Sequence, residues 1–484
     1  MSTLFRKKSL TALLTDAHSG DKSLKRTLGS MALIGLGIGA IIGAGIFVRT
    51  AAAAGAHAGP GVIFSFVIAG IGCALAGLCY AEFSSMIPIA GSAYTYSYAT
   101  MGEFVAWIIG WDLVLEYALG AATVSIAWSE YFNNFLSSYF GTQVPYQWCH
   151  SPFQTSVDGV SGIMNVPALF ILLVLSAVLI RGTSESATVN NIIVIVKVAI
   201  VLMFIALGWS FINPINHVPM VPSNTGTFGE FGWSGVLRGA GIVFFAYIGF
   251  DAVSTAAQEA KDPQRGMPIG ILGSLVFCTL IYIIFSYVLT GVANYKDFAP
   301  GGAGHEASVS WAIQKYMPGY SWLANLITVA ILAGFSSVIL VMLLGQSRVF
   351  YSMSKDGLLP GIFSEIHPKY HTPWKSNMIL FLFVGVFGSF LPGDVVGDMT
   401  SIGTLFAFVL VCIGVIVMRK NDPDAVRPFK TPWVPVVPIL GALVCLAMIF
   451  GLGMANWTRL IIWLAIGFVI YFGYSRNHSK LHKA

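Results

Sequence analysis

The chain has 484 residues, of which 56% are hydrophobic and only 10% are charged, and its formal net charge is +5. A water-soluble protein of this size carries charge on about a quarter of its residues. So small a charged fraction cannot cover a surface that faces water, and the composition therefore excludes a soluble globular protein.

The apolar residues gather into blocks of roughly twenty residues, the length that crosses about 30 Å of hydrocarbon as an α-helix. The blocks are continuously apolar and lack the alternation of outer-membrane strands, which favours helices over a barrel. The sequence predicts an all-α integral membrane protein with about 12 transmembrane helices. Their expected spans are 31–54, 61–86, 104–134, 164–181, 189–213, 236–258, 268–292, 320–350, 375–392, 397–418, 432–453 and 457–475.

Lysine and arginine are distributed unevenly between the loops. Lys7 and Lys8 precede the first block, and Arg419 follows the tenth. With the N-terminus in the cytoplasm, most basic residues fall on the cytoplasmic side, as the positive-inside rule requires. We expect a multi-pass protein of the cytoplasmic membrane with both termini in the cytoplasm, 1–30 forming an N-terminal segment and 476–484 a tail. The lipid bilayer is thus an expected partner, and nucleic acid is not.

The first block contains closely spaced glycines in GLGIGAIIGAGIF. One interpretation is close packing between helices, which small residues commonly permit in membranes. The other is a helix that unwinds around Gly43, Ala44 and Gly45 and then restarts, because glycine lowers the steric cost of non-helical torsions. The restarted half would offer amide hydrogens to a carboxylate, and the preceding half would offer carbonyls to an ammonium group. A break would therefore match the zwitterionic head of an α-amino acid.

The sixth block contains a second candidate break, because Gly249 interrupts a bulky run that leads to Asp251. Paired interruptions in corresponding halves are typical of transporters built from inverted repeats, with the binding site at the repeat interface. We expect helices 1–5 (31–213) and 6–10 (236–418) to form the two repeats, followed by helices 11 and 12 (432–475). This prediction rests on the layout of the blocks, since the two halves show no strong residue-level identity.

Lys197 lies inside the fifth block, about ten ångströms from its expected cytoplasmic end by helical rise. Its ammonium group could reach back to the membrane interface, as long cationic side chains often do. Alternatively it faces the protein interior, where it must donate to carbonyls or lose its proton. The second interpretation makes Lys197 a candidate proton-coupling residue.

Two acidic residues also lie in apolar blocks. Glu116 is either a substrate contact or a hydrogen-bonded brace between helices, because a carboxyl group within a membrane helix is a functional candidate. Glu82, near the end of the second block, is expected to brace helices at the interface. Cysteines and histidines show no ligand-like spacing, so we expect no metal and no cofactor.

Four stretches of the chain closely resemble the amino acid–polyamine–organocation superfamily, specifically the bacterial relatives of the cationic amino acid transporters. The stretches are LKRTLGSMALIGLGIGAIIGAGIF, YAEFSSMIPIAGSAYTYSY, FFAYIGFDAVSTAAQEAKDPQRGMPIGI and GQSRVFYSMSKDGLLP. The resemblance implies a LeuT-like fold, a five-plus-five inverted repeat with two C-terminal helices. It leaves open whether a small membrane accessory subunit is bound.

The resemblance also implies roles for individual residues. The amides of Ala44 and Gly45 would meet the substrate carboxylate. The Phe245 side chain would form part of the gate over the binding pocket. Lys197 would replace the sodium ion of related transporters, which argues for proton coupling. The carbonyls that would meet the amino group belong to Ile41, Phe245, Ala246 and Ile248.

These observations favour secondary active uptake of L-amino acids by alternating access, the expected substrates being small neutral ones such as alanine carried together with protons. The alternative is a sodium-independent transporter or exchanger of arginine and lysine, whose cationic side chain Glu116 could neutralise. Met342 and Phe335 in the eighth block suit a small apolar side chain. An enzyme is not expected, because the sequence shows no nucleophile–base pair or metal cluster.

Overall fold

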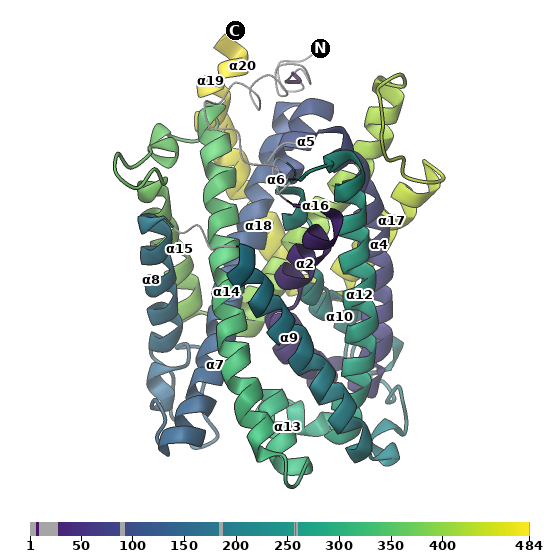
Figure 1. Ribbon diagram of the computed structural model, residues 1–484, viewed down its shortest axis with the longest axis vertical. Helices are drawn as coiled ribbons and strands as arrows, with labels where there is room; N and C mark the ends of the chain where they lie inside the picture. Colours follow the sequence, from purple (N-terminus) through teal and green to yellow (C-terminus); the bar gives the residue numbers. More distant parts are fainter. Residues whose placement is uncertain are drawn as a thin grey trace.

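The computed structural model describes residues 6–8, 28–87, 92–182, 187–255, 257 and 260–483. Most of the predicted N-terminal segment 1–30 lies outside these residues. Within the described residues the regular structure is helical, and extended pairing is limited to isolated β-bridges. The long helices run along the long axis of the molecule, with α13 at the end opposite α19 and α20 (Figure 1).

Every predicted block coincides with one or more helices. Seven helical stretches in the described residues are long and apolar enough to cross a membrane, and shorter apolar helices lie between them. The main helices are α2 (Ser30–Ile41), α4 (Val62–Met86), α6 (Glu103–Val114), α7 (Gly120–Phe140), α8 (Val166–Arg181), α9 (Ala187–Gly208), α10 (Gly232–Val243), α12 (Pro263–Val292), α14 (Ser321–Lys355), α15 (Trp374–Phe390), α16 (Gly393–Asn421), α17 (Val436–Gly451) and α18 (Met454–Ile470).

Short helical segments complete these spans or link them. Three π-helical turns, η2, η3 and η5, continue the first and third spans, and η13 continues the last. The segments are η2 (Gly45–Arg49), α3 (Thr50–Ala53), η3 (Ala54–Ala58), η4 (Gly59–Gly61), α5 (Ser92–Thr100), η5 (Leu115–Leu119), η6 (Tyr146–Trp148), η7 (Trp209–Phe211), η8 (Pro214–His217), η9 (Phe244–Tyr247), α11 (Ala252–Thr255), η11 (Tyr295–Phe298), α13 (Ser308–Tyr316), η12 (Gly361–Ser364), η13 (Tyr471–Ser475), α19 (Arg476–His478) and α20 (Lys480–Lys483).

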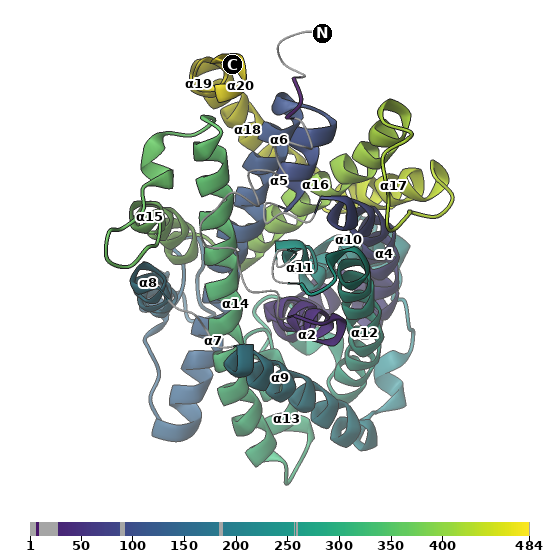
Figure 2. The same cartoon turned by 45° about the horizontal axis from the view of Figure 1, so that its top comes forward.

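The first and sixth spans are both interrupted near their middle. The first half-helix, α2, ends at Ile41, the next residue is extended (φ −73°, ψ 100°), and the chain restarts at η2. In the sixth span η9 is followed by Gly249 at φ 111°, a conformation that favours glycine, before α11 begins. Figure 2 shows α2 and α11 at the centre of the bundle, with α14 on one side and α12 on the other. The break predicted in each half is therefore present.

Glu82 ties α4 to α16 and to the segment that follows it. Its carboxylate accepts hydrogen bonds from the Nε and Nη2 atoms of Arg419 at 2.9 and 2.8 Å, and from the backbone amide of Thr431 at 2.7 Å. Arg427 approaches the same carboxylate at 3.4 Å. The expectation that Glu82 braces helices is confirmed.

The two ends of the described chain meet beside the start of α6. The Arg6 guanidinium donates to the carbonyl of Leu481 at 3.1 Å, and the Lys8 ammonium pairs with Asp356 at 3.2 Å. Ser479 donates a short hydrogen bond to the buried carboxylate of Glu103. Segments from both ends of the chain thus pack against the same ends of α6 and α14.

Candidate functional site

The first break leaves backbone carbonyls at the end of α2 that no amide of the same helix can reach. The Lys197 ammonium donates to the carbonyl of Gly39 at 3.1 Å. The hydroxyl of Tyr282, on α12, donates to the carbonyl of Ile41 at 3.0 Å. A positive charge at a helix C-terminus also interacts favourably with the helix dipole. Two side chains from other helices therefore cap this half-helix.

The second break lies directly against the first. The Tyr282 hydroxyl also donates to the carbonyl of Ala246 at 2.9 Å, so one side chain joins both interruptions. A Cβ added to Gly45 would stand 2.2 Å from the Cα of Ala246, which means that the two backbones touch. Gly249 packs in the same way on the backbone of Ala40. Glycine is needed at these positions because the chains approach so closely.

The residues predicted to hold a substrate are brought together by these breaks. Ala44 is the N-cap residue of the restarted helix, and its side chain accepts no hydrogen bond from the amides of the first turn. Gly43 faces the side chain of Val338 on α14, and a Cβ added to Gly43 would lie 3.3 Å from Val338 Cγ2. All the members of the set at the two breaks are buried: Ile41, Gly43, Ala44, Gly45, Phe245, Ala246 and Ile248. Their roles in substrate binding stay predictions.

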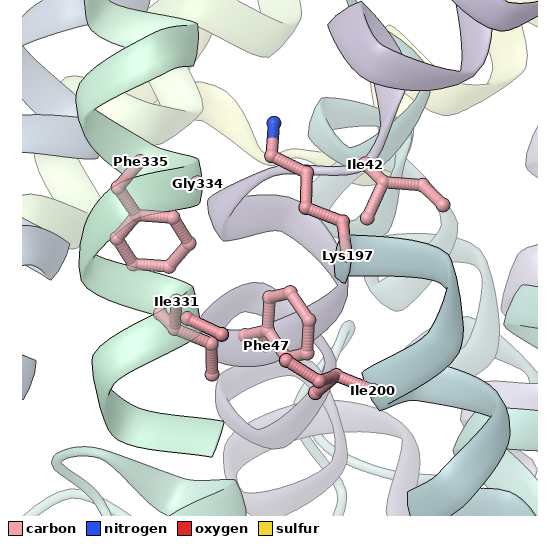
Figure 3. Close-up of a pocket in the computed structure, with 8 residues that line it drawn as sticks. Ile42, Phe47, Lys197, Ile200, Ile331, Gly334 and Phe335 are labelled. Carbon is pink, nitrogen blue, oxygen red and sulfur yellow. The ribbon is translucent and has the colours of Figure 1, made fainter. Parts of the chain in front are cut away.

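Lys197 is 4% exposed and points from α9 into the space between α14 and the first break (Figure 3). An added Cβ at Gly334 would stand 2.8 Å from its Cε, so the lysine stem packs against α14. A cavity of about 10 Å³ beside it is lined by Ile42, Phe47 and Phe335 among others. The interpretation that Lys197 reaches the membrane interface is wrong, because its ammonium group binds a backbone carbonyl in the interior.

Glu116 lies with a second carboxyl group that the sequence pattern did not pair with it. Its side chain is fully buried in η5 and interacts electrostatically with Asp251. The Tyr117 hydroxyl donates to Asp251 at 2.7 Å. Asp251 follows the second break along the chain, so Glu116 lies beside the residues just beyond that break. Gly249 marked Asp251 as a residue beside a break, but no local pattern paired it with Glu116.

The opposite side of the breaks is closed by ion pairs. Arg49, which is 3% exposed, donates to Asp398 through a short hydrogen bond and to Asp394 at 3.2 Å. Both aspartates belong to α16. A cavity of about 40 Å³ runs from Ala44 past Arg49 towards Glu130, and it also meets the loop residues Gln154 and His305. This cavity and the one beside Lys197 are both small.

The described residues include no group of three or more histidine, cysteine, aspartate or glutamate side chains placed to hold a metal ion. The ligands that this site presents are instead backbone carbonyls and amides at two facing breaks. Such an arrangement complements a small molecule that carries opposite charges close together.

Together, the apolar spans and the facing breaks define a multi-pass α-helical membrane protein of the transporter class. The family model for amino acid permeases matches residues 28–473. The chain therefore belongs to the amino acid permease family, within the superfamily that the sequence motifs indicated.

Individual relatives match over nearly the full length of the chain. It is 46% identical to the branched-chain amino acid permease BcaP of Bacillus subtilis (strain 168), over 99% of both chains. It is 43% identical to the methylthioribose transporter of the same organism, over 100% of both chains. It is 33% identical to the vacuolar cationic amino acid transporter 4 of Arabidopsis thaliana, over 88% of this chain and 68% of the relative. Relatives within one family thus differ in the substrate that they carry.

Proposed function

We propose that this protein takes up neutral L-amino acids across the cytoplasmic membrane as a proton-coupled symporter that works by alternating access. The observation that carries the proposal is the meeting of two broken helices, where the carbonyls of Ile41 and Ala246 face one buried donor, Tyr282. An α-ammonium group can bind such carbonyls, and the restarted helix at Ala44 offers amides to an α-carboxylate.

The proposal includes an architecture and an orientation. Twelve spans would comprise two inverted repeats, 31–213 and 236–418, and two further helices in 432–475. Both termini would face the cytoplasm, consistent with the basic residues at that end. Opening would then alternate between the cytoplasmic side, closed at Asp251 and Tyr117, and the outer side, closed at Arg49.

The preferred side chain is aliphatic in this proposal. Phe335 and Met342 on α14 are buried and apolar, and two relatives are named as branched-chain amino acid permeases. Alanine and the branched-chain amino acids are therefore the first substrates to test. Methylthioribose is the informative contrast, because it has neither an α-ammonium nor an α-carboxylate group.

A cationic amino acid transporter or exchanger is the second candidate. The pairing of Glu116 with Asp251 specifically favours it, since two acidic side chains lie near one another beyond the second break. Several relatives are named as cationic amino acid transporters. A cationic side chain that extended from the breaks towards Glu116 would meet both carboxyl groups.

Reconstitution in proteoliposomes tests these alternatives. An inward proton gradient should drive accumulation of radiolabelled alanine or leucine above equilibrium, and a protonophore should abolish it. Uptake of arginine that needs internal amino acid and ignores the proton gradient would instead establish the exchanger. A thermal-shift screen with the twenty amino acids and methylthioribose identifies the ligand class independently, because ligands that bind the folded state raise its Tm.

A further inference from the structure

Tyr282 occupies an unusual position between the two breaks. It is fully buried on α12, and its single hydroxyl proton is shared between the carbonyls of Ile41 and Ala246, at 3.0 and 2.9 Å. The rings of Phe66 and Tyr247 pack against it, each with a centroid separation of 5.4 Å. The ring is therefore held in place, and the hydroxyl is aimed at both carbonyls.

These carbonyls are members of the set proposed to bind the substrate's ammonium group. A buried carbonyl without a donor is costly, because it has lost its hydrogen bonds to water. The substrate-free molecule must nevertheless close around both of them. Tyr282 supplies a neutral donor in that state, whereas a bound ammonium group would bring three N–H donors to the same place.

We propose that the Tyr282 hydroxyl stands in for the substrate's ammonium group and so allows the empty transporter to close and return to the outside. This inference rests on the proposed amino acid transport and concerns a positioning residue of the same site. Net uptake requires the return of the empty transporter in every cycle. Exchange of external for internal amino acid does not, because the transporter returns loaded.

The test compares net uptake with exchange in proteoliposomes that contain Tyr282→Phe. This variant keeps the ring and removes the hydroxyl. We expect the ratio of net uptake to exchange to fall about tenfold, the order expected when a buried acceptor loses its donor. The substrate-induced rise in Tm should increase at the same time, because the ammonium group now satisfies carbonyls that lack a donor.

Tyr247→Phe is the matched control. Its hydroxyl is also buried and donates to a backbone carbonyl, that of Phe66 at 3.0 Å, but Phe66 lies in the uninterrupted helix α4. Loss of that hydrogen bond should leave the ratio unchanged, whatever its effect on the amount of folded protein.

The outcomes are distinct. Net uptake and exchange reduced by the same factor in Tyr282→Phe would mean a purely structural role and would overturn the inference. If the unaltered protein shows neither activity with any amino acid, the proposed function fails instead. If Tyr282→Phe does not fold, Tyr282→His retains a ring N–H on a shorter side chain; an at least twofold lower ratio is expected, and an unchanged ratio contradicts the inference.

Discussion

Gly45 and Gly35 lie in the same interrupted span, yet their surroundings differ completely. An added methyl group at Gly45 would collide with the backbone of Ala246, whereas nothing lies within 4 Å of one at Gly35. Backbone cannot shift as a flexible side chain can, so the two breaks would have to move apart. This contrast separates the contact between the breaks from general effects of glycine replacement.

We therefore predict that Gly45→Ala abolishes amino acid uptake and lowers the Tm, since overpacking costs about 1–3 kcal/mol or more. Gly35→Ala, the matched control, should retain uptake and stabilise the helix by about 0.5–1 kcal/mol. Thermal unfolding in detergent and uptake by proteoliposomes measure both effects. Full uptake by Gly45→Ala would show that the contact is dispensable.

The second prediction at the residue scale concerns Lys197 and proton coupling. Lys197→Ala should abolish the dependence of uptake on the proton gradient, because it removes the ammonium group that donates to the carbonyl of Gly39 at the end of α2. Exchange driven by an amino acid gradient should survive at a measurable rate. Lys375→Ala is the control, since Lys375 pairs with Glu365 where both side chains are partly exposed and surface pairs contribute about 0–1 kcal/mol. Unchanged proton coupling in Lys197→Ala would eliminate this role.

Local sequence predicted some of these residues and not others. The glycines on either side of Ala44 indicated a break, because closely spaced glycines lower the cost of non-helical torsions whatever the rest of the fold. Tyr282 was missed, since it lies in the continuous helix α12 and no local pattern distinguishes it from a packing aromatic. The approach of Glu116 to Asp251 was missed too, because it depends on how two distant helices pack.

At the scale of elements, η2 and α16 are joined by two aspartates of unequal burial. The side chain of Asp398 is 13% exposed, that of Asp394 is 64% exposed, and both reach the buried guanidinium of Arg49. Removal of one partner from a buried pair leaves an uncompensated charge and costs about 3–5 kcal/mol, whereas an exposed pair contributes about 0–1 kcal/mol. The two aspartates should therefore differ in their importance for outer closure.

We predict that Asp398→Asn lowers the Tm far more than Asp394→Asn, which serves as its control. Asp398→Asn should also open the cavity of about 40 Å³ beside Arg49, which Ala52 lines. A cysteine introduced at Ala52 should therefore react faster with a membrane-impermeant maleimide. Equal effects of the two substitutions on both measurements would contradict this account of outer closure.

Helices were predicted well in position but less well in length. The third span continues to Phe140, beyond the predicted residue 134, because its polar last turns remain helical outside the apolar block. Likewise α14 extends to Lys355. Neither α5 nor α13 was predicted, because helices of nine residues without a long apolar run leave no signal in a search for spans. Apolar length therefore indicates where the chain can cross the membrane, and other contacts determine where a helix ends.

At the scale of the whole molecule, the ion pair between His150 and Glu306 links two loops that are far apart in the sequence. His150 Nε2 lies 2.8 Å from Glu306 Oε1, and the Cys149 thiol lies 3.3 Å from His150 Nδ1. Burial alone would lower the pKa of His150, but its hydrogen bonds with Cys149 and Glu306 raise it to about 10. Burial alone would raise the pKa of Glu306, yet the hydrogen bond and charge of His150 hold it below its usual value.

The signs of these shifts predict how stability depends on pH. The raised pKa of His150 stabilises the fold fully below the ordinary value of 6.5, and this contribution is lost as pH rises towards about 10. The lowered pKa of Glu306 stabilises the fold above its ordinary value of 4.5 and is lost as pH falls. The Tm difference between the unaltered protein and Glu306→Gln should thus be largest near pH 5–6 and shrink by pH 10.

Glu365→Gln is the control for this pH series, because its carboxylate pairs with Lys375 at the start of α15. Its Tm difference from the unaltered protein should be small and should not show the same decline above pH 6.5. A Glu306→Gln difference that stays constant from pH 5 to pH 10 would mean that the loop pair does not contribute to stability.

The contact of Arg6 with Leu481 and Glu103 beside α6 has a practical consequence for anyone who labels or shortens this protein. Ser475 and Ser479 are buried, and they donate to the carbonyl of Leu358 and the carboxylate of Glu103. A chain trimmed after Tyr474 would lose both donors, although only ten residues had been removed. A fluorescent protein or affinity tag fused to the C-terminal side therefore needs a flexible spacer, so that Ser475 and Ser479 can still pack against the ends of α6 and α14.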